Sequence, residues 1–136
     1  MNWLLKTEPN EYSYADLEKE NTAVWDGVKN ALALKNMRTM LPGEKAFIYH
    51  TGKERRIIGV AEILSKAYPD PKLNDTKRVV IDVRAVRQLS EPITLKQIKL
   101  DERFAGFDLL RLPRLSIVPV LPQHWQCLLE LTANRI

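Results

Sequence analysis

The residue types best suited to hold a ligand lie together in one short stretch, VWDGVKN, from Val24 to Asn30. Trp25 offers a flat aromatic surface, Asp26 a carboxylate and Lys29 a cation. A planar heterocycle is held by stacking on aromatic side chains, worth ~1–3 kcal/mol per base, and by polar groups that read its edge. The stretch has none of the apolar periodicity that core packing produces. It therefore indicates a site for a flat polar ligand near phosphate.

The same site would draw on residues from elsewhere in the chain. Gly27 would let a backbone N–H come close to the ligand, and Asn30 and Ser116 would supply donors and acceptors. The cations that could meet phosphate groups are Lys6, Lys29, Lys35, Arg38, Arg55 and Arg56. A pocket that reads the base, with cations on its rim that hold the phosphates, is the usual arrangement of a nucleic-acid site.

Each candidate also has a purely structural interpretation. Trp25 could fill the core, since tryptophan is usually largely buried, and Asp26-Gly27 could be only a turn. His50 could reach a ligand from the end of a strand, and it could equally be a hydrogen-bonded structural histidine. Arg111 and Arg114 could each hold a phosphate or pair with a carboxylate. The residues alone leave these alternatives open.

Catalytic and metal-binding patterns are missing from the sequence. The two histidines, His50 and His124, are far apart, and there is no HExxH, GxSxG or P-loop motif. The single cysteine, Cys127, offers neither a metal-binding pair nor an intrachain disulfide. We predict no catalytic residue, no metal site and no cofactor, although Asp26 and Glu8 could form a general acid–base pair.

Length and composition indicate one globular domain spanning residues 1–136, with 45% apolar and 28% charged residues. The net charge is +4 and the isoelectric point about 9.3. Charge is uneven along the chain: residues 1–28 hold two basic and six acidic residues, and residues 29–56 hold seven basic and two acidic ones. The second block could attract a phosphate backbone, or it could be an ordinary solvated surface.

Nothing in the sequence indicates a membrane or secretory protein. The apolar start ends at Lys6, which is too short for a signal peptide, and no run approaches the ~20 apolar residues that span a bilayer. We therefore expect a cytoplasmic protein. Because there is no heptad pattern or large apolar stripe, we also expect a monomer.

Apolar patterns and capping signals divide the chain into short elements. Residues 55–64 are apolar on both faces, so this strand is predicted to be central in the sheet. Gly59 within it would let a backbone or a ligand approach closely. The predicted strands are 2–6, 44–50, 55–64, 78–89 and an extended, proline-rich edge at 111–122. The predicted helices are 14–20 after a capping box at Ser13, 30–41, one capped by Thr94 and Gln97, and one starting at Pro122. Strands and short helices alternate without a regular βαβ order. This predicts an α+β fold, with about five or six strands in a mixed β-barrel and short flanking helices.

Five motifs resemble those of the EVE domain family of the PUA-like superfamily: NWLLKTEPNEYSYADL, VWDGVKN, FIYHTG, GVAEI with AYPDP, and RLSIVPV. They occur in the family's order and cover residues 2–130. The resemblance implies a PUA-like β-barrel and a pocket for a modified base of DNA or RNA. The positions that match the family's motifs are Lys6, Glu8, Pro9, Trp25, Asp26, Gly27, Val28, Lys29, Asn30, Tyr49, His50, Arg111, Arg114, Leu115 and Ser116.

We therefore predict a non-catalytic nucleic-acid-binding module that recognises a modified base of RNA or DNA in a pocket near Trp25. Asp26, Asn30 and Ser116 are predicted to read the base edge; Lys29, Arg38, Arg111 and Arg114 are predicted to form rim contacts. Two alternatives remain: an enzyme acting on a modified nucleotide or small heterocycle, and a small-metabolite-binding protein whose basic surface is incidental. Salt dependence separates nucleic-acid binding from metabolite binding, because only a ligand held through phosphate contacts loses affinity steeply as the salt concentration rises.

Overall fold

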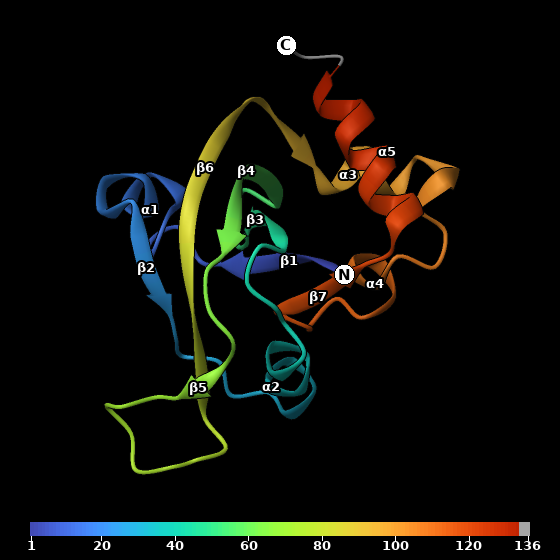
Figure 1. Cartoon of the computed structure of the whole chain (residues 1–136). Helices are drawn as coiled ribbons and strands as arrows, with labels where there is room; N and C mark the ends of the chain where they lie inside the picture. The colour runs from blue at the N-terminus through green and yellow to red at the C-terminus, as the bar shows by residue number, and fades with distance from the viewer. Residues whose placement is uncertain (134–136) are drawn as a thin grey trace.

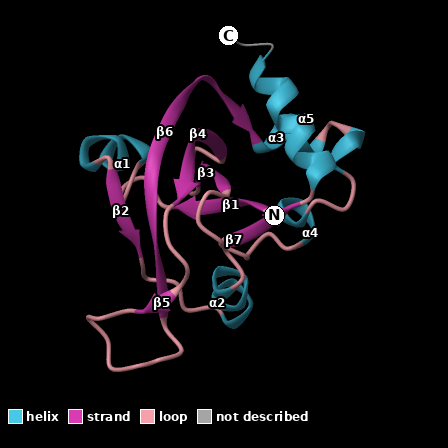
Figure 2. Cartoon of the chain, viewed as in Figure 1, coloured by secondary structure: helices cyan, strands magenta, loops and turns pink. Residues whose placement is uncertain are grey.

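The computed structural model describes residues 1–133, which form an α+β fold (Figures 1 and 2). The strands are β1 (Asn2–Thr7), β2 (Thr22–Trp25), β3 (Lys45–His50), β4 (Arg56–Ile63), β5 (Tyr68–Pro69), β6 (Val79–Thr94) and β7 (Ile117–Val120). The helices are α1 (Tyr14–Glu20), α2 (Ala31–Arg38), α3 (Leu95–Lys99), α4 (Asp108–Arg111) and α5 (Pro122–Ala133), with a 3₁₀ turn at Glu102–Phe104.

The strands form one mixed sheet of seven strands in the order β2-β6-β4-β3-β1-β7, with β5 paired to β6. β1 runs parallel to β3, and the other pairs are antiparallel. The α+β class is confirmed. The expectation of a barrel of five or six strands needs correction, because within the described residues β2 and β7 are the two ends of an open order. The short strands β2 and β5 had too few residues for a clear alternating pattern.

Local signals account for where four of the five described α-helices begin. Ser13 and Thr94 each start a helix with a capping box, as predicted. The side chain of Asn30 accepts a hydrogen bond from the backbone N–H of Ala33 and so caps α2. Pro122 opens α5, where its missing N–H costs nothing. β4 lies between β6 and β3 and is central, in agreement with its continuous apolar sequence.

Helix α1 is anchored to the sheet by an aromatic ring that lies over a glycine. A Cβ atom built on Gly59 would come within 2.5 Å of the Tyr14 ring, so only glycine leaves room for it. The Tyr14 hydroxyl donates to the carbonyl of Val60 at 2.8 Å, and burial raises the pKa of Tyr14 to about 12. The close approach expected at Gly59 is therefore made by α1 and not by a ligand.

Four segments meet beside Trp25: the end of β2, the end of β1, the segment before β7 and the loop of residues 26–30. Trp25 is the last residue of β2 and pairs with Ile81 of β6. At the end of β1, the backbone N–H of Lys6 donates to the carbonyl of Ser116 at 2.9 Å, which holds the segment before β7 beside β1. Residues 26–30 then connect β2 to α2 across the space between them.

Candidate functional site

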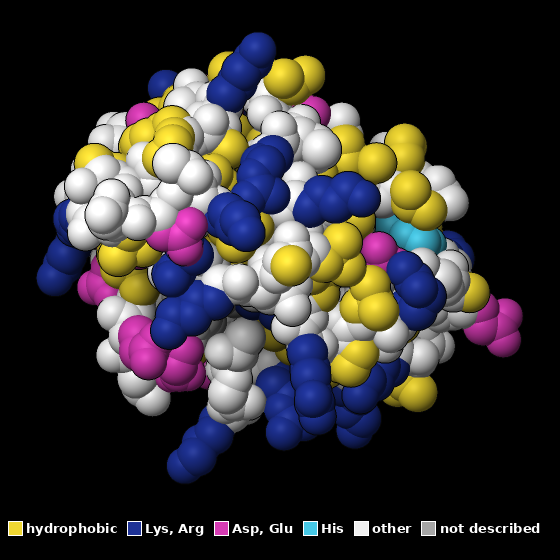
Figure 3. Space-filling model, turned by 90° about the horizontal axis from the view of Figure 1, so that it is seen from below, with side chains coloured by type: hydrophobic (Ala, Val, Ile, Leu, Met, Phe, Trp, Pro, Cys, Tyr) yellow, Lys and Arg dark blue, Asp and Glu magenta, His cyan; other side chains and the backbone are white. Residues whose placement is uncertain are grey.

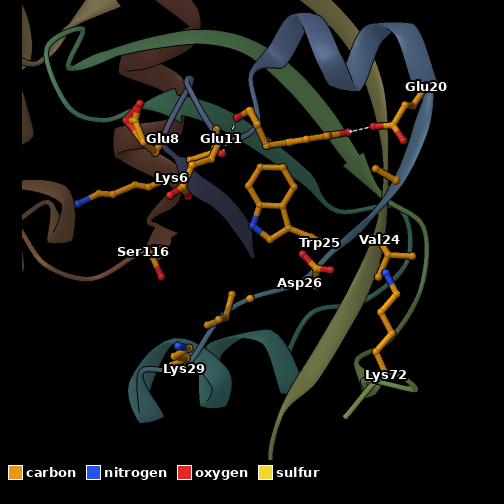
Figure 4. Close-up of a pocket in the computed structure, with 15 residues that line it drawn as sticks. Lys6, Glu8, Glu11, Glu20, Val24, Trp25, Asp26, Lys29, Lys72 and Ser116 are labelled. Carbon is orange, nitrogen blue, oxygen red and sulfur yellow. Dashed lines mark hydrogen bonds between the residues drawn. The ribbon is translucent and has the colours of Figure 1, made fainter.

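An open cleft of about 730 Å³ lies beside Trp25, between β1, the segment before α1, the end of α1, β2 and the 26–29 loop. Figure 4 shows the Trp25 indole at the centre of this cleft, with Lys6, Glu8 and Glu11 on one side. The cleft is lined by Lys6, Thr7, Glu8, Glu11, Tyr12, Glu20, Ala23, Val24, Trp25, Asp26, Gly27, Val28, Lys29, Lys72 and Ser116.

Trp25 serves both as a core residue and as a wall of the cleft. Its side chain is only 7% exposed and belongs to the hydrophobic core. The Tyr12 ring meets it edge-on, with centroids 6.2 Å apart and planes at 84°. The Tyr12 hydroxyl donates to the Glu20 carboxylate at 2.6 Å; burial and this hydrogen bond raise the pKa of Tyr12, which keeps it protonated. The indole is thus held rigidly while part of it adjoins open space.

The charges around the cleft are mixed, not uniformly basic. Three lysines and four carboxylates line it: Lys6, Lys29, Lys72, Glu8, Glu11, Glu20 and Asp26. Two of the carboxylates have internal partners, since Glu20 accepts from Tyr12 and Glu8 accepts from the backbone N–H of Asn10 at 2.9 Å. An anionic group would meet repulsion inside the cleft and attraction at its lysines.

Several polar groups at the cleft are available to a ligand. Asp26 and Lys29 are exposed, and within residues 1–133 their side chains make no hydrogen bond or ion pair. Lys6 is more constrained: its ammonium donates to the carbonyl of Pro113 at 2.8 Å and lies 5.8 Å from the centroid of the Tyr49 ring. Burial lowers the pKa of Lys6.

The loop that carries Asp26 has a conformation of its own. Gly27 has φ +78°, a left-handed value that favours glycine, and no atom lies within 4 Å of the position where a Cβ would be. Backbone geometry, not crowding, is the reason for glycine here. The Arg78 side chain donates to the carbonyl of Val28 at 2.9 Å and fixes the loop from the far side. Sequence reasoning did not identify this role of Arg78.

Three predicted site residues lie in a second hollow beside the cleft. Asn30, Arg111 and Arg114 line a space of about 400 Å³ together with Leu32, Leu112, Pro113 and Leu115. The Asn30 side-chain oxygen is already used by the cap of α2, at 3.0 Å from the Ala33 nitrogen. The sequence placed these three residues with Trp25, whereas in the structure they line the second hollow and not the cleft.

His50, a predicted site residue, lies away from Trp25 and has hydrogen-bond partners within the fold. It is buried, one ring nitrogen accepts the backbone N–H of Tyr14 at 3.0 Å, and the other lies 2.9 Å from the Glu54 carboxylate. Its hydrogen bond lowers the pKa of Glu54. Both ring nitrogens are therefore occupied, and His50 is outside the lining of the Trp25 cleft.

Four of the predicted rim cations are also outside the cleft. Lys35 and Arg38 are exposed on α2, and Arg38 donates to the carbonyl of Lys77 at 2.8 Å. Arg55 lines a separate hollow of about 560 Å³ that also includes Lys53, Lys96 and Lys99. Arg56 pairs with Glu54 at 3.3 Å.

The cleft also contains residues that the sequence did not single out: Glu11, Tyr12, Glu20 and Lys72. Tyr12 and Glu11 fall inside the NWLLKTEPNEYSYADL motif, so the motif was a usable signal for them. Lys72 is in the loop between β5 and β6, far from the other members in sequence, and no local pattern pointed to it.

Residues 1–133 contain neither a metal-binding cluster nor a membrane-spanning helix. In this range no three His, Cys, Asp or Glu side chains are grouped so that they could hold a metal ion. Nor does any helix in the described part of the chain combine the length and apolar character needed to cross a membrane.

Comparison with known proteins finds relatives along nearly the whole chain. Thymocyte nuclear protein 1 of Gallus gallus is 31% identical, with 98% of this chain and 69% of the relative covered. A structure from Rhodopseudomonas palustris superposes with a TM-score of 0.91 at 34% identity, covering 98% of this chain and 93% of the other. The human THYN1 protein, solved in complex with 5-methylcytosine-containing DNA, has a TM-score of 0.88 at 30% identity and 96% coverage of both chains. An ASCH protein from Zymomonas mobilis, at 16% identity and a TM-score of 0.59, shares the fold alone.

These relatives correct one expectation. The curated relatives from mouse, chicken and human are all thymocyte nuclear protein 1, a name that points to the nucleus. The expectation of a cytoplasmic protein is therefore wrong by this comparison. A lone cysteine and the lack of a signal peptide are equally compatible with a nuclear protein, because neither feature separates the two compartments.

The chain as a whole thus has counterparts among known proteins. The EVE domain family model matches residues 1–131, nearly the full length of the chain. This chain belongs to the EVE domain family.

Proposed function

We propose that this chain is a non-catalytic module that binds nucleic acid carrying a modified base and seats that base against Trp25. The observation that carries the proposal is the open cleft of about 730 Å³, in which a rigid indole lies among polar and cationic side chains. The human relative solved with 5-methylcytosine-containing DNA supports the same ligand class.

The mixed charge of the cleft favours a base over a phosphate as the group that enters. Four carboxylates in the lining oppose a phosphate within the cleft and can accept hydrogen bonds from exocyclic amino groups. A carboxylate accepting from the N4 amino group is the usual way to read cytosine. We assign this role to Asp26, with the Ser116 hydroxyl and the backbone of Gly27 as further edge contacts, and Val28 as an apolar neighbour.

The lysines of the cleft would hold the phosphates on either side of the base. Lys29 and Lys72 are exposed, whereas Lys6 is tied to Pro113 and contributes charge from a fixed position. Lys35 and Arg38, on the exposed side of α2, would meet the backbone further along. Arg55 lines the separate hollow that includes Lys53, Lys96 and Lys99, and Arg56 pairs with Glu54 of the same hollow. These two arginines could contact only a longer nucleic-acid strand, at phosphates distant from the modified base.

The proposal is tested by binding of a labelled oligonucleotide carrying 5-methylcytosine, compared with the same strand carrying cytosine. Asp26→Asn keeps the shape but replaces one acceptor oxygen by a donor. We expect it to weaken binding about 5- to 150-fold, in keeping with ~1–3 kcal/mol for a base-edge contact. Glu102→Gln, at an exposed carboxylate that lines none of the hollows described, is the charge-matched control. Equal binding by wild type and Asp26→Asn would remove Asp26 from the site.

Because Glu8 and Asp26 line the same cleft, the enzyme alternative is tested beside it. Incubation with modified nucleosides and oligonucleotides, followed by mass spectrometry, is expected to show no turnover. A product that forms with wild type and not with Asp26→Asn would replace the reader by an enzyme.

A further inference from the structure

The second hollow differs in character from the cleft beside Trp25. Its volume is about 400 Å³, and aliphatic side chains supply most of its lining. Leu32 of α2 is 43% exposed at one side, and residues 112, 113 and 115 form the other. This surface would favour a flat apolar face, such as that of a nucleobase, over a lone phosphate.

The two hollows are neighbours on both of their shared walls. On one wall Lys29 lines the cleft and the next residue, Asn30, lines the second hollow. On the other wall Ser116 lines the cleft and Leu115 the second hollow. Because consecutive residues on each wall line different hollows, the two hollows adjoin each other. Successive nucleotides of one strand could therefore reach both hollows.

The cations at the second hollow fit the same ligand. Arg114 is exposed, and within the described residues its guanidinium makes no hydrogen bond or ion pair. Arg111 is bound to Asp108 through Nε at 2.9 Å, which leaves its two terminal nitrogens free of hydrogen bonds to the described part of the chain. A guanidinium can stack on a base and can also hold a phosphate in two hydrogen bonds. Figure 3, seen from the α2 side of the molecule, shows hydrophobic side chains lying among lysine and arginine on this face.

We propose that the hollow between α2 and residues 111–115 holds the nucleobase next to the modified base, with Leu32 packed against that base and Arg114 at its phosphate. The inference rests on the proposed function and extends it to recognition of a dinucleotide unit. It assigns to Leu32 a contact that neither the sequence nor the comparisons indicated.

The test uses single-stranded DNA with one 5-methylcytosine and either normal neighbours, an abasic site on its 5′ side or an abasic site on its 3′ side. For wild type we expect one of the two abasic strands to bind about 5- to 10-fold more weakly, at the low end of stacking contributions. Leu32→Asn should weaken the intact strand by a similar factor and should no longer distinguish that abasic strand from it. Arg114→Gln should weaken all three strands and keep the difference between them.

Leu100→Asn is the matched control, because Leu100 is an exposed leucine, 76% accessible, that lines neither hollow. The inference is overturned if neither abasic strand binds wild type more weakly, or if Leu32→Asn shows the same abasic penalty as wild type. If the preference for 5-methylcytosine persists in those cases, the proposed function stands and only the second base site is lost. If wild type binds none of the strands, the proposed function fails first.

Discussion

At the scale of single residues, Trp25 shows why core and binding interpretations need not compete. The residue is 7% exposed and packs in the core, with Tyr12 against its ring edge-on. A stacking surface gains from this rigidity, because little conformational entropy is lost when a base binds. Asp26 and Lys29, the next charged residues in the chain, are exposed and free for a ligand.

Gly27 gives a prediction about backbone strain. Its φ of +78° is costly for a residue with a Cβ, so Gly27→Ala should lower the free energy of unfolding by about 1–2 kcal/mol. Asparagine tolerates this region better, and Gly27→Asn should lose less. Urea unfolding measures both. Because a Cβ there would meet open space, an alanine as stable as glycine would show that the loop is not held at this φ.

His50 and Glu54 give a prediction about pH. The hydrogen bond from His50, with help from Arg56, lowers the pKa of Glu54. A carboxyl group with a lowered folded-state pKa stabilises the fold above its ordinary pKa of 4.5, and this contribution is lost as the pH falls through the lowered value. As the pH falls below about 4.5, wild type should therefore lose stability more steeply than Glu54→Gln. Parallel curves of unfolding free energy against pH would exclude this coupling.

At the scale of elements, helices with a capping motif were predicted correctly, whereas features without a local sequence signal were not. The capping boxes at Ser13 and Thr94 placed two helices correctly. Helix α4 went unrecognised because its N-cap, Phe107, makes no side-chain hydrogen bond and so leaves no mark in the sequence. Closure of the sheet also depends on long-range pairing, which periodicity does not reveal.

The candidate site was also only partly predictable from the sequence. Residues adjacent in sequence, from Trp25 to Lys29, could be grouped from one stretch. Lys72 could not, because tertiary packing alone brings its loop to the cleft. Arg111 and Arg114 were assigned to the cleft, but the short helix α4 and the extended turn after it direct them to the second hollow.

The start of α2 gives a prediction at this scale. Asn30 caps the helix that forms one wall of the second hollow, so Asn30→Ala should cost about 1 kcal/mol of stability, within the 0.5–2 kcal/mol range of lost caps. Asn30→Ser, which restores a capping oxygen, should recover most of it. Thermal unfolding compares the three proteins. If alanine and serine were equally stable, the capping role of Asn30 would be refuted.

At the scale of the whole molecule, the fold mixes two charge blocks that are separate in the sequence. The acidic first 28 residues supply all four carboxylates of the cleft, and the lysines at positions 29 and 72 come from later segments. The basic block therefore does not form one continuous binding track. Its cations are spread over the cleft, α2 and the hollow that contains Arg55.

This distribution predicts a modest salt dependence. If Lys29 and Lys72 each neutralise one phosphate of a single strand, each should contribute about −0.7 to the slope of log affinity against log salt. Lys29→Gln and Lys72→Gln should each reduce the slope by that amount, whereas Arg55→Gln should change it little on a short strand. Titrations at several salt concentrations measure the slopes. A larger change for Arg55→Gln would move the main phosphate contact to the separate hollow.

The central claim is that the modified base lies against Trp25 when nucleic acid is bound. A crystal structure of this chain with a short strand carrying 5-methylcytosine measures this directly. The account predicts the methylated ring stacked on the Trp25 indole, with its amino group at the Asp26 carboxylate and its phosphates toward Lys29 and Lys72. A complex in which the strand binds elsewhere and the Trp25 cleft holds no base would contradict it.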